Sequence, residues 1–116
     1  MSETPDYREW QGEEVRAASG DKIGSLEDVY FESETGHAMF LLVKSGLLGR
    51  RLTFVPVRGT RPGRTYLQVQ PSDEEIKQAP TIDSGADLTA DDEERIYRYY
   101  SLDYQRPTSG RRLMRR

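Results

Sequence analysis

The chain has 116 residues, which is the length of one domain, and a formal net charge of −3. It contains no cysteine and one histidine, which excludes disulfides, thiolate catalysis, Cys-type zinc sites and a multi-histidine metal site within one chain. No apolar run approaches the ~20 residues that cross a bilayer, and the polar, acidic N-terminus is unlike a signal peptide. We therefore expect a cytoplasmic protein with no transmembrane segment and no bound cofactor.

The first nine residues are polar and are expected to be disordered, so the folded domain is predicted to begin at Trp10. A lone tryptophan ahead of the first strand is typical of a lid that packs on one end of a β-barrel. The first strand is predicted over residues 14–18, where apolar and polar residues alternate. Gly20 lies in the turn that follows and supplies the positive φ that a tight hairpin needs.

The second strand is predicted over residues 22–32, and its alternation changes part-way along. Gly24 is the expected cause, because a bulge or bend at a glycine shifts the side-chain register. The adjacent carboxylates of Glu27 and Asp28 suggest an acid and base pair, but neighbouring strand residues point to opposite faces. We therefore interpret Asp28 as a structural acceptor of backbone N–H groups and Glu27 as a solvated side chain.

A hairpin loop is predicted at residues 33–36, with Gly36 in the left-handed conformation that closes it. His37 follows the loop and is the one histidine of the sequence. Because no nucleophile or metal ligand accompanies it, we interpret His37 as a turn residue rather than as a proton shuttle.

The next two strands, predicted over residues 38–45 and 51–57, are apolar in both alternating positions. A sheet with one wet face would alternate, so either the C-terminal helix or a second copy of the chain is expected to cover their outer faces. Pro56 donates no ladder hydrogen bond and is expected at a strand end or a sheet edge. A type II turn at residues 61–64 leads to a closing strand at residues 65–69. Five or six short strands with hairpin connections predict a mainly β fold, a small antiparallel β-barrel.

A loop with the sequence Gly-Leu-Leu-Gly-Arg-Arg joins these two apolar strands at residues 46–51. Leaving Leu47 and Leu48 in water would cost ~25 cal/mol per Å² of apolar area. They are therefore expected either to tuck back onto the barrel or to form the tip of a contact surface, beside Arg50 and Arg51.

Two short helices are predicted after the strands, at about residues 72–79 and 89–100, because a Ser or Thr cap with acids in the first turn opens each of them. A stripe of Ile96, Tyr97 and Tyr100 on the second helix is a natural cover for the doubly apolar strands.

The last stretch, residues 105–116, holds five arginines and no acid. Mutual repulsion and a small apolar area predict a disordered basic tail. Its candidate partners are an acidic protein, RNA or an anionic lipid surface. A broad nucleic-acid-binding face is not expected, because the body of the domain is not basic.

Several stretches in a fixed order carry a family resemblance: Gly-Asp-Lys-Ile-Gly at 20–24, Leu-Glu-Asp-Val-Tyr at 26–30, Leu-Val-Lys-Ser-Gly at 42–46 and Phe-Val-Pro-Val at 54–57. This order resembles the PRC-barrel domain over about residues 10–80, and the chain looks like a free-standing bacterial member. The family is named for the cytoplasmic domain of the photosynthetic reaction-centre H subunit, and it also forms the C-terminal half of the ribosome maturation factor RimM. The resemblance implies a small β-barrel with C-terminal additions, used in known members as an adaptor that docks onto other proteins.

We therefore expect a non-enzymatic protein-interaction module, homodimeric and with an unidentified protein partner. The alternatives are an accessory protein of photosynthesis or electron transfer, and an enzyme that uses acidic residues. The dimer is expected to form through the outer faces of the apolar strands and the rim around them, and its candidate interface residues are Met39, Leu41, Leu47, Leu48, Arg50, Arg51, Tyr97 and Tyr100. The residues assigned a structural role are Gly20, Gly24, Asp28, Gly36 and Pro56.

Overall fold

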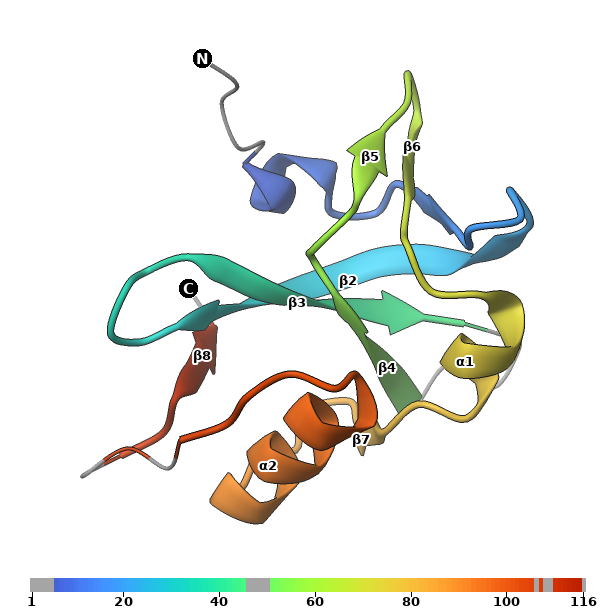
Figure 1. Cartoon of the computed structure of the whole chain (residues 1–116). Coiled ribbons are helices and arrows are strands. Elements are labelled where there is room, and N and C mark those ends of the chain that lie inside the picture. The colour runs from blue at the N-terminus through green and yellow to red at the C-terminus, as the bar shows by residue number, and fades with distance from the viewer. Residues whose placement is uncertain (1–5, 46–50, 106, 108–109, 116) are drawn as a thin grey trace.

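The computed structural model describes residues 6–45, 51–105, 107 and 110–115, and within them the chain is mainly β (Figure 1). The described elements are one 3-10 helix, two short α-helices and eight strands. In chain order they are η1 (Tyr7–Trp10), β1 (Glu14–Arg16), β2 (Lys22–Glu32), β3 (Ala38–Lys44), β4 (Arg51–Pro56), β5 (Arg61–Pro62), β6 (Tyr66–Gln68), α1 (Asp73–Lys77), β7 (Thr81–Asp83), α2 (Ala90–Tyr99) and β8 (Leu113–Arg115).

All eight strands belong to one sheet, in the order β5-β6-β1-β2-β3-β4-β7, with β8 paired to β2 beside this path. The neighbouring strands are antiparallel except β1 and β6, which are parallel. The expectation of a purely antiparallel sheet is wrong at that pair, because β6 returns to β1 across the body of the domain rather than through a hairpin. Among the described residues no pairing joins β5 to β7, so the sheet is not closed into a barrel.

Two apolar cores lie on opposite faces of β3. Figure 1 shows η1, β5 and β6 on one side of β2 and β3, with α2 on the other side. The inner core contains Leu41 and Val43 of β3, and the outer core contains Phe40 and Leu42 of the same strand. Successive strand residues point to opposite faces, so β3 is apolar in both alternating positions because each face is buried in its own core.

The outer core is covered by α2. The ring of Tyr97 meets that of Phe40 edge-on with centroids 5.3 Å apart, and the hydroxyl of Tyr100 donates a hydrogen bond of 2.5 Å to the backbone oxygen of Phe54. Of the two covers that the sequence allowed for the apolar strands, the chain's own C-terminal helix is the one observed.

The positions of the two α-helices agree with the sequence prediction. Ser72 caps α1 and Thr89 caps α2, each in a capping box with the acidic residue three positions later. Each box satisfies two backbone N–H groups that the first helical turn leaves without partners. The sequence signal was therefore sufficient for both helix starts.

Described residues within both stretches that were expected to be disordered form regular structure. Residues Tyr7–Trp10 form η1, and Tyr7 is buried in the inner core. At the other end Leu113–Arg115 forms β8, antiparallel to Tyr30–Glu32 of β2. The basic residues near β8 find acids contributed by distant parts of the chain, which a local count of charges cannot reveal.

Candidate interaction surfaces

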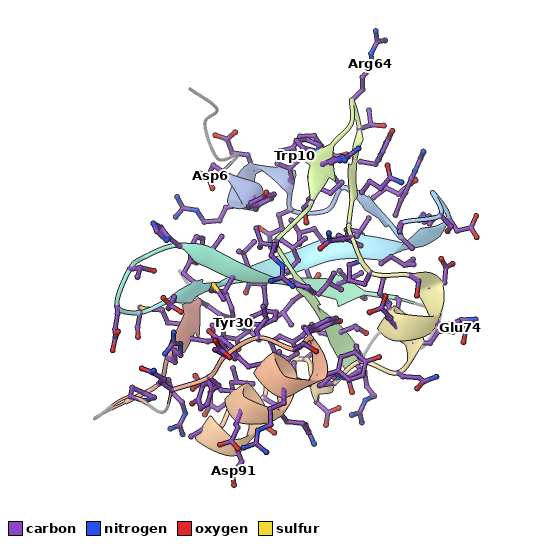
Figure 2. All side chains as sticks on the ribbon, viewed as in Figure 1. Asp6, Trp10, Tyr30, Arg64, Glu74 and Asp91 are labelled. Carbon is purple, nitrogen blue, oxygen red and sulfur yellow. The ribbon has the colours of Figure 1, made fainter. Side chains whose placement is uncertain are left out.

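A groove of about 630 Å³ opens between η1, the loop joining β2 to β3, and the end of β4. Figure 2 marks its η1 side by the label of Asp6. Its walls are mostly apolar, with a few charged or titratable groups at the rim. The lining residues are Asp6, Tyr7, Arg8, Phe31, Gly36, His37, Ala38, Met39, Pro56, Val57, Arg58 and Leu102.

The η1 wall of the groove is fixed by one short-range ion pair. Asp6 caps η1 by accepting hydrogen bonds from the backbone N–H of Arg8 at 3.1 Å and from its guanidinium at 3.1 and 3.2 Å. The Arg8 hydrogen bonds hold the pKa of the Asp6 carboxyl below its usual value, so this pair is charged at neutral pH. The Arg8 guanidinium lies 5.8 Å from the centre of the Phe31 ring, which keeps it over the groove wall.

The opposite rim carries His37 and Arg58. The backbone N–H of His37 donates to the Thr35 hydroxyl at 3.2 Å, and Gly36 has the left-handed φ of 75° that turns the chain into β3. Among the described residues Arg58 has no ion-pair partner. The groove therefore offers an apolar floor with the Asp6–Arg8 pair on one side and the Arg58 cation at the rim, which suits an apolar side chain accompanied by a carboxylate.

Sequence reasoning missed this groove because it treated residues 1–9 as disordered. Trp10, expected to act as a lid, is half-buried and packs against the inner core at the end of η1. The signal that could have found η1 is the Asp6 cap followed by Tyr7, an aromatic residue that needs burial.

Three of the five described residues of the predicted dimer surface are buried within one chain. Leu41 belongs to the inner core, and Tyr97 and Tyr100 belong to the outer core beneath α2. A second copy of the chain is therefore not needed to bury these three residues. Met39 is half-buried and lines the groove described above.

The remaining predicted interface residues belong to the loop at residues 46–51. Arg51 is exposed, donates to the Thr81 hydroxyl at 2.8 Å and forms an ion pair of 3.6 Å with Asp83 of the neighbouring strand β7. Leu47, Leu48 and Arg50 lie outside the described residues.

The glycines and the proline assigned a structural role lie at special backbone positions. A Cβ on Gly24 would lie 2.2 Å from the backbone oxygen of Lys44, so β2 approaches β3 more closely there than any side chain allows. The register of β1 against β2 shifts at this point, since Val15 faces Gly24 and Arg16 faces Lys22. Gly20 has a φ of 95°. Pro56 ends β4 and faces Phe40 of β3.

The acidic pair Glu27 and Asp28 lies at a second irregularity. The register of β2 against β3 shifts between Leu26 and Asp28, so strict alternation does not hold at Glu27. The Asp28 carboxylate is nevertheless engaged: it accepts a hydrogen bond of 2.8 Å from the backbone N–H of Val29 and forms an ion pair of 3.3 Å with Arg115. This is the structural environment expected for Asp28.

The described part of the chain contains neither a metal-binding cluster nor a membrane-spanning helix. No group of three or more His, Cys, Asp or Glu side chains in residues 6–45, 51–105, 107 and 110–115 could hold a metal ion. None of the helices within those ranges has the length and apolar character needed to span a membrane.

These features define a small β module built on one sheet, with a groove at one end and a helix over the far face. The model of the PRC-barrel domain family matches residues 4–76, more than half of the chain, and the chain belongs to this family. The match begins before η1 and ends within α1, so β7, α2 and β8 lie beyond it. A comparison with curated proteins gives no match.

Proposed function

We propose that this chain is a non-enzymatic adaptor that docks a segment of a partner protein into the groove between η1 and the β2–β3 loop. Membership of the PRC-barrel family supports a module of the protein-interaction type. The observation that carries the proposal is the groove itself, because a mostly apolar hollow with a few polar groups at its rim is the usual form of a binding site.

The chemistry of the rim specifies the kind of partner segment. An apolar side chain of the partner segment fills the floor beside Met39 and Val57. A neighbouring carboxylate of the same segment pairs with Arg58 at the rim. Arg8 already has Asp6 as its partner, so Arg58 is the stronger attraction for an incoming acid. Rim charges of this kind contribute to orientation and association rate more than to affinity.

Site-specific photo-cross-linking in extracts of the source cell tests this function. A photoreactive amino acid is placed at position Met39 of the full chain, and at Arg64 in a matched control, because Arg64 projects from the tip between β5 and β6, away from the groove (Figure 2). A discrete adduct at position 39 and none at position 64 is the expected result. Arg58→Glu should at least halve the yield of that adduct, and equal adducts at both positions would contradict the proposal.

Self-association stays a prediction at the loop of residues 46–51. The double substitution Leu47→Asp and Leu48→Asp tests it, since a dimer held by this loop would become monomeric in a sedimentation experiment. An unmodified chain that sediments as a monomer at high micromolar concentration would contradict that prediction and leave the loop as a docking tip.

A further inference from the structure

The C-terminal segment of residues 111–115 fills a binding site made by residues distant from it in sequence. Its strand β8 pairs with the last three residues of β2, where Leu113 faces Glu32 and Arg115 faces Tyr30. This is the same edge of β2 that β1 occupies near the start of that strand. Figure 1 shows β8 at the end of β2, on the side of the sheet where α2 lies. The edge of β2 thus receives an added strand, which is a common mode of peptide recognition.

The first pocket of this site holds the guanidinium of Arg112. Two of its nitrogens lie 2.9 and 3.1 Å from one carboxylate oxygen of Glu32. The guanidinium also lies 5.5 Å from the centre of the Tyr97 ring and 6.0 Å from that of Tyr104. An acid beside two aromatic rings is a favourable environment for an arginine side chain.

The second pocket holds the backbone and side chain around Leu113. Its side chain is buried in the outer core, and its N–H donates to the carboxylate of Glu93 at 2.8 Å. The other oxygen of Glu93 accepts from the N–H of Arg112 at 3.2 Å and from the hydroxyl of Tyr104 at 2.8 Å. Glu93 is fully buried, so two of its three donors would be missing if no segment filled the site.

The third pocket holds Arg115. Its guanidinium forms an ion pair of 3.3 Å with Asp28, donates to the hydroxyl of Tyr30 at 3.1 Å and lies 5.2 Å from the centre of that ring. Met114, between the two anchored positions, is exposed. The site therefore recognises an extended segment with arginine, an apolar residue, any residue and arginine in that order.

We propose that this site exchanges its occupant between two copies of the chain, so that residues 111–115 of each copy fill the site of the other. Every copy carries both the site and a segment that fits it, so a reciprocal exchange conserves all three pockets and their contacts. Seven residue steps separate Tyr104 from Arg111, which reach about 23–25 Å when extended.

Concentration decides between the two forms. A short connection gives the chain's own segment an effective concentration in the millimolar range. At micromolar concentration each chain therefore keeps its own segment, and the exchanged form becomes populated as the concentration approaches that range. This exchange is independent of any contact through the loop at residues 46–51.

Charge reversal at one pair tests the exchange in full-length protein. One chain carries Glu32→Arg and the other carries Arg112→Glu, so each alone opposes like charges within its own first pocket. When the two are mixed at roughly 0.1–1 mM, exchange restores opposite charges at both sites, and light scattering should show a species of twice the monomer mass that contains both chains. The chain with both substitutions, alone at the same concentration, is the control. It restores the pair internally, so its dimer fraction should equal that of the unmodified chain and stay below that of the mixture.

If either single variant fails to fold alone, refolding the two together should recover folded protein of doubled mass, and no recovery would overturn the exchange. A mixture that stays monomeric while the control folds would also overturn it. A synthetic peptide of residues 110–116 completes the test: if it binds the Arg112→Glu chain but mixed chains stay monomeric, the second copy is the wrong occupant and the site belongs to an arginine-containing segment of another protein.

Discussion

The carboxylate of Glu93, in the first turn of α2, accepts a hydrogen bond of 2.8 Å from the backbone N–H of Leu113 at the start of β8. This bond joins two elements that both lie beyond the region matched by the family model. One of them covers the outer face of the sheet, and the other adds a strand to its edge. The C-terminal part of the chain is thus a single layer whose parts depend on one another.

We expect Glu93→Gln to destabilise this layer. An amide offers one acceptor oxygen where the carboxylate serves three donors through two oxygens, so at least one buried donor loses its partner, at a cost of about 1–3 kcal/mol. Glu94→Gln is the matched control, because Glu94 forms a partly exposed pair with Arg98, of the kind that contributes about 1 kcal/mol or less. Urea unfolding of both variants measures the difference, and equal losses would contradict this account of Glu93.

The adjacent residues Leu113 and Met114 should respond very differently to truncation. Leu113 is 2% exposed and Met114 is 42% exposed. Leu113→Ala is expected to cost about 2–5 kcal/mol through lost burial and the cavity that remains, and Met114→Ala about 0.5 kcal/mol or less. If both variants unfold at the urea concentration of the parent chain, β8 does not contribute to the stability of the fold.

The strands and helices were predictable where local signals are strong. The predicted boundaries of β2 are the observed ones, because apolar residues, turn residues and Gly24 all lie within a short stretch. The caps Ser72 and Thr89 identify the two helix starts. The parallel pairing of β1 with β6 was not predictable, because it depends on how distant strands meet in space.

The C-terminal site was missed for a related reason. The residues next to Arg112 in the sequence include arginines and no acid, and the repulsion among these arginines predicts a disordered tail. The acid that pairs with Arg112 is Glu32, eighty positions earlier. The buried acceptor Glu93 belongs to a helix start whose acids the sequence explains by the cap alone, with no sign that one of them is buried. The groove was missed because Tyr7 and Arg8 lie in a stretch too short for any periodic pattern.

Gly24 provides a test of close strand approach. In Gly24→Ala the new Cβ would lie 2.2 Å from the backbone oxygen of Lys44, which cannot move without breaking the pairing of β2 with β3. We expect a loss of about 3 kcal/mol or more, at the upper end for overpacked sites. Gly20→Ala is the control, because its surroundings are open and only its φ of 95° is strained, at about 1–2 kcal/mol. Thermal unfolding that ranks Gly20→Ala as the more damaging change would contradict this explanation.

The last prediction concerns alkaline pH. Burial raises the pKa of Tyr97 to about 12, with the Arg112 guanidinium opposing the shift, whereas an unfolded tyrosine titrates near pH 10. Between these values the unfolded chain has lost the proton that the folded chain retains, so the free energy of unfolding falls as pH rises. This one group contributes a slope of about 1.4 kcal/mol per pH unit, with its full stabilisation present below pH 10.

Tyr97→Phe should remove that slope and leave the contribution of Tyr100, whose pKa burial also raises. Urea unfolding at several values between about pH 9 and 12, for the parent chain and this variant, gives the two slopes. Tyr66→Phe is the control, because Tyr66 is half-exposed and lies under the Arg16 guanidinium on the other side of the sheet. A parent slope that Tyr97→Phe and Tyr66→Phe change equally would show that the outer core does not keep Tyr97 protonated, and that α2 leaves this face of the sheet open to water at high pH.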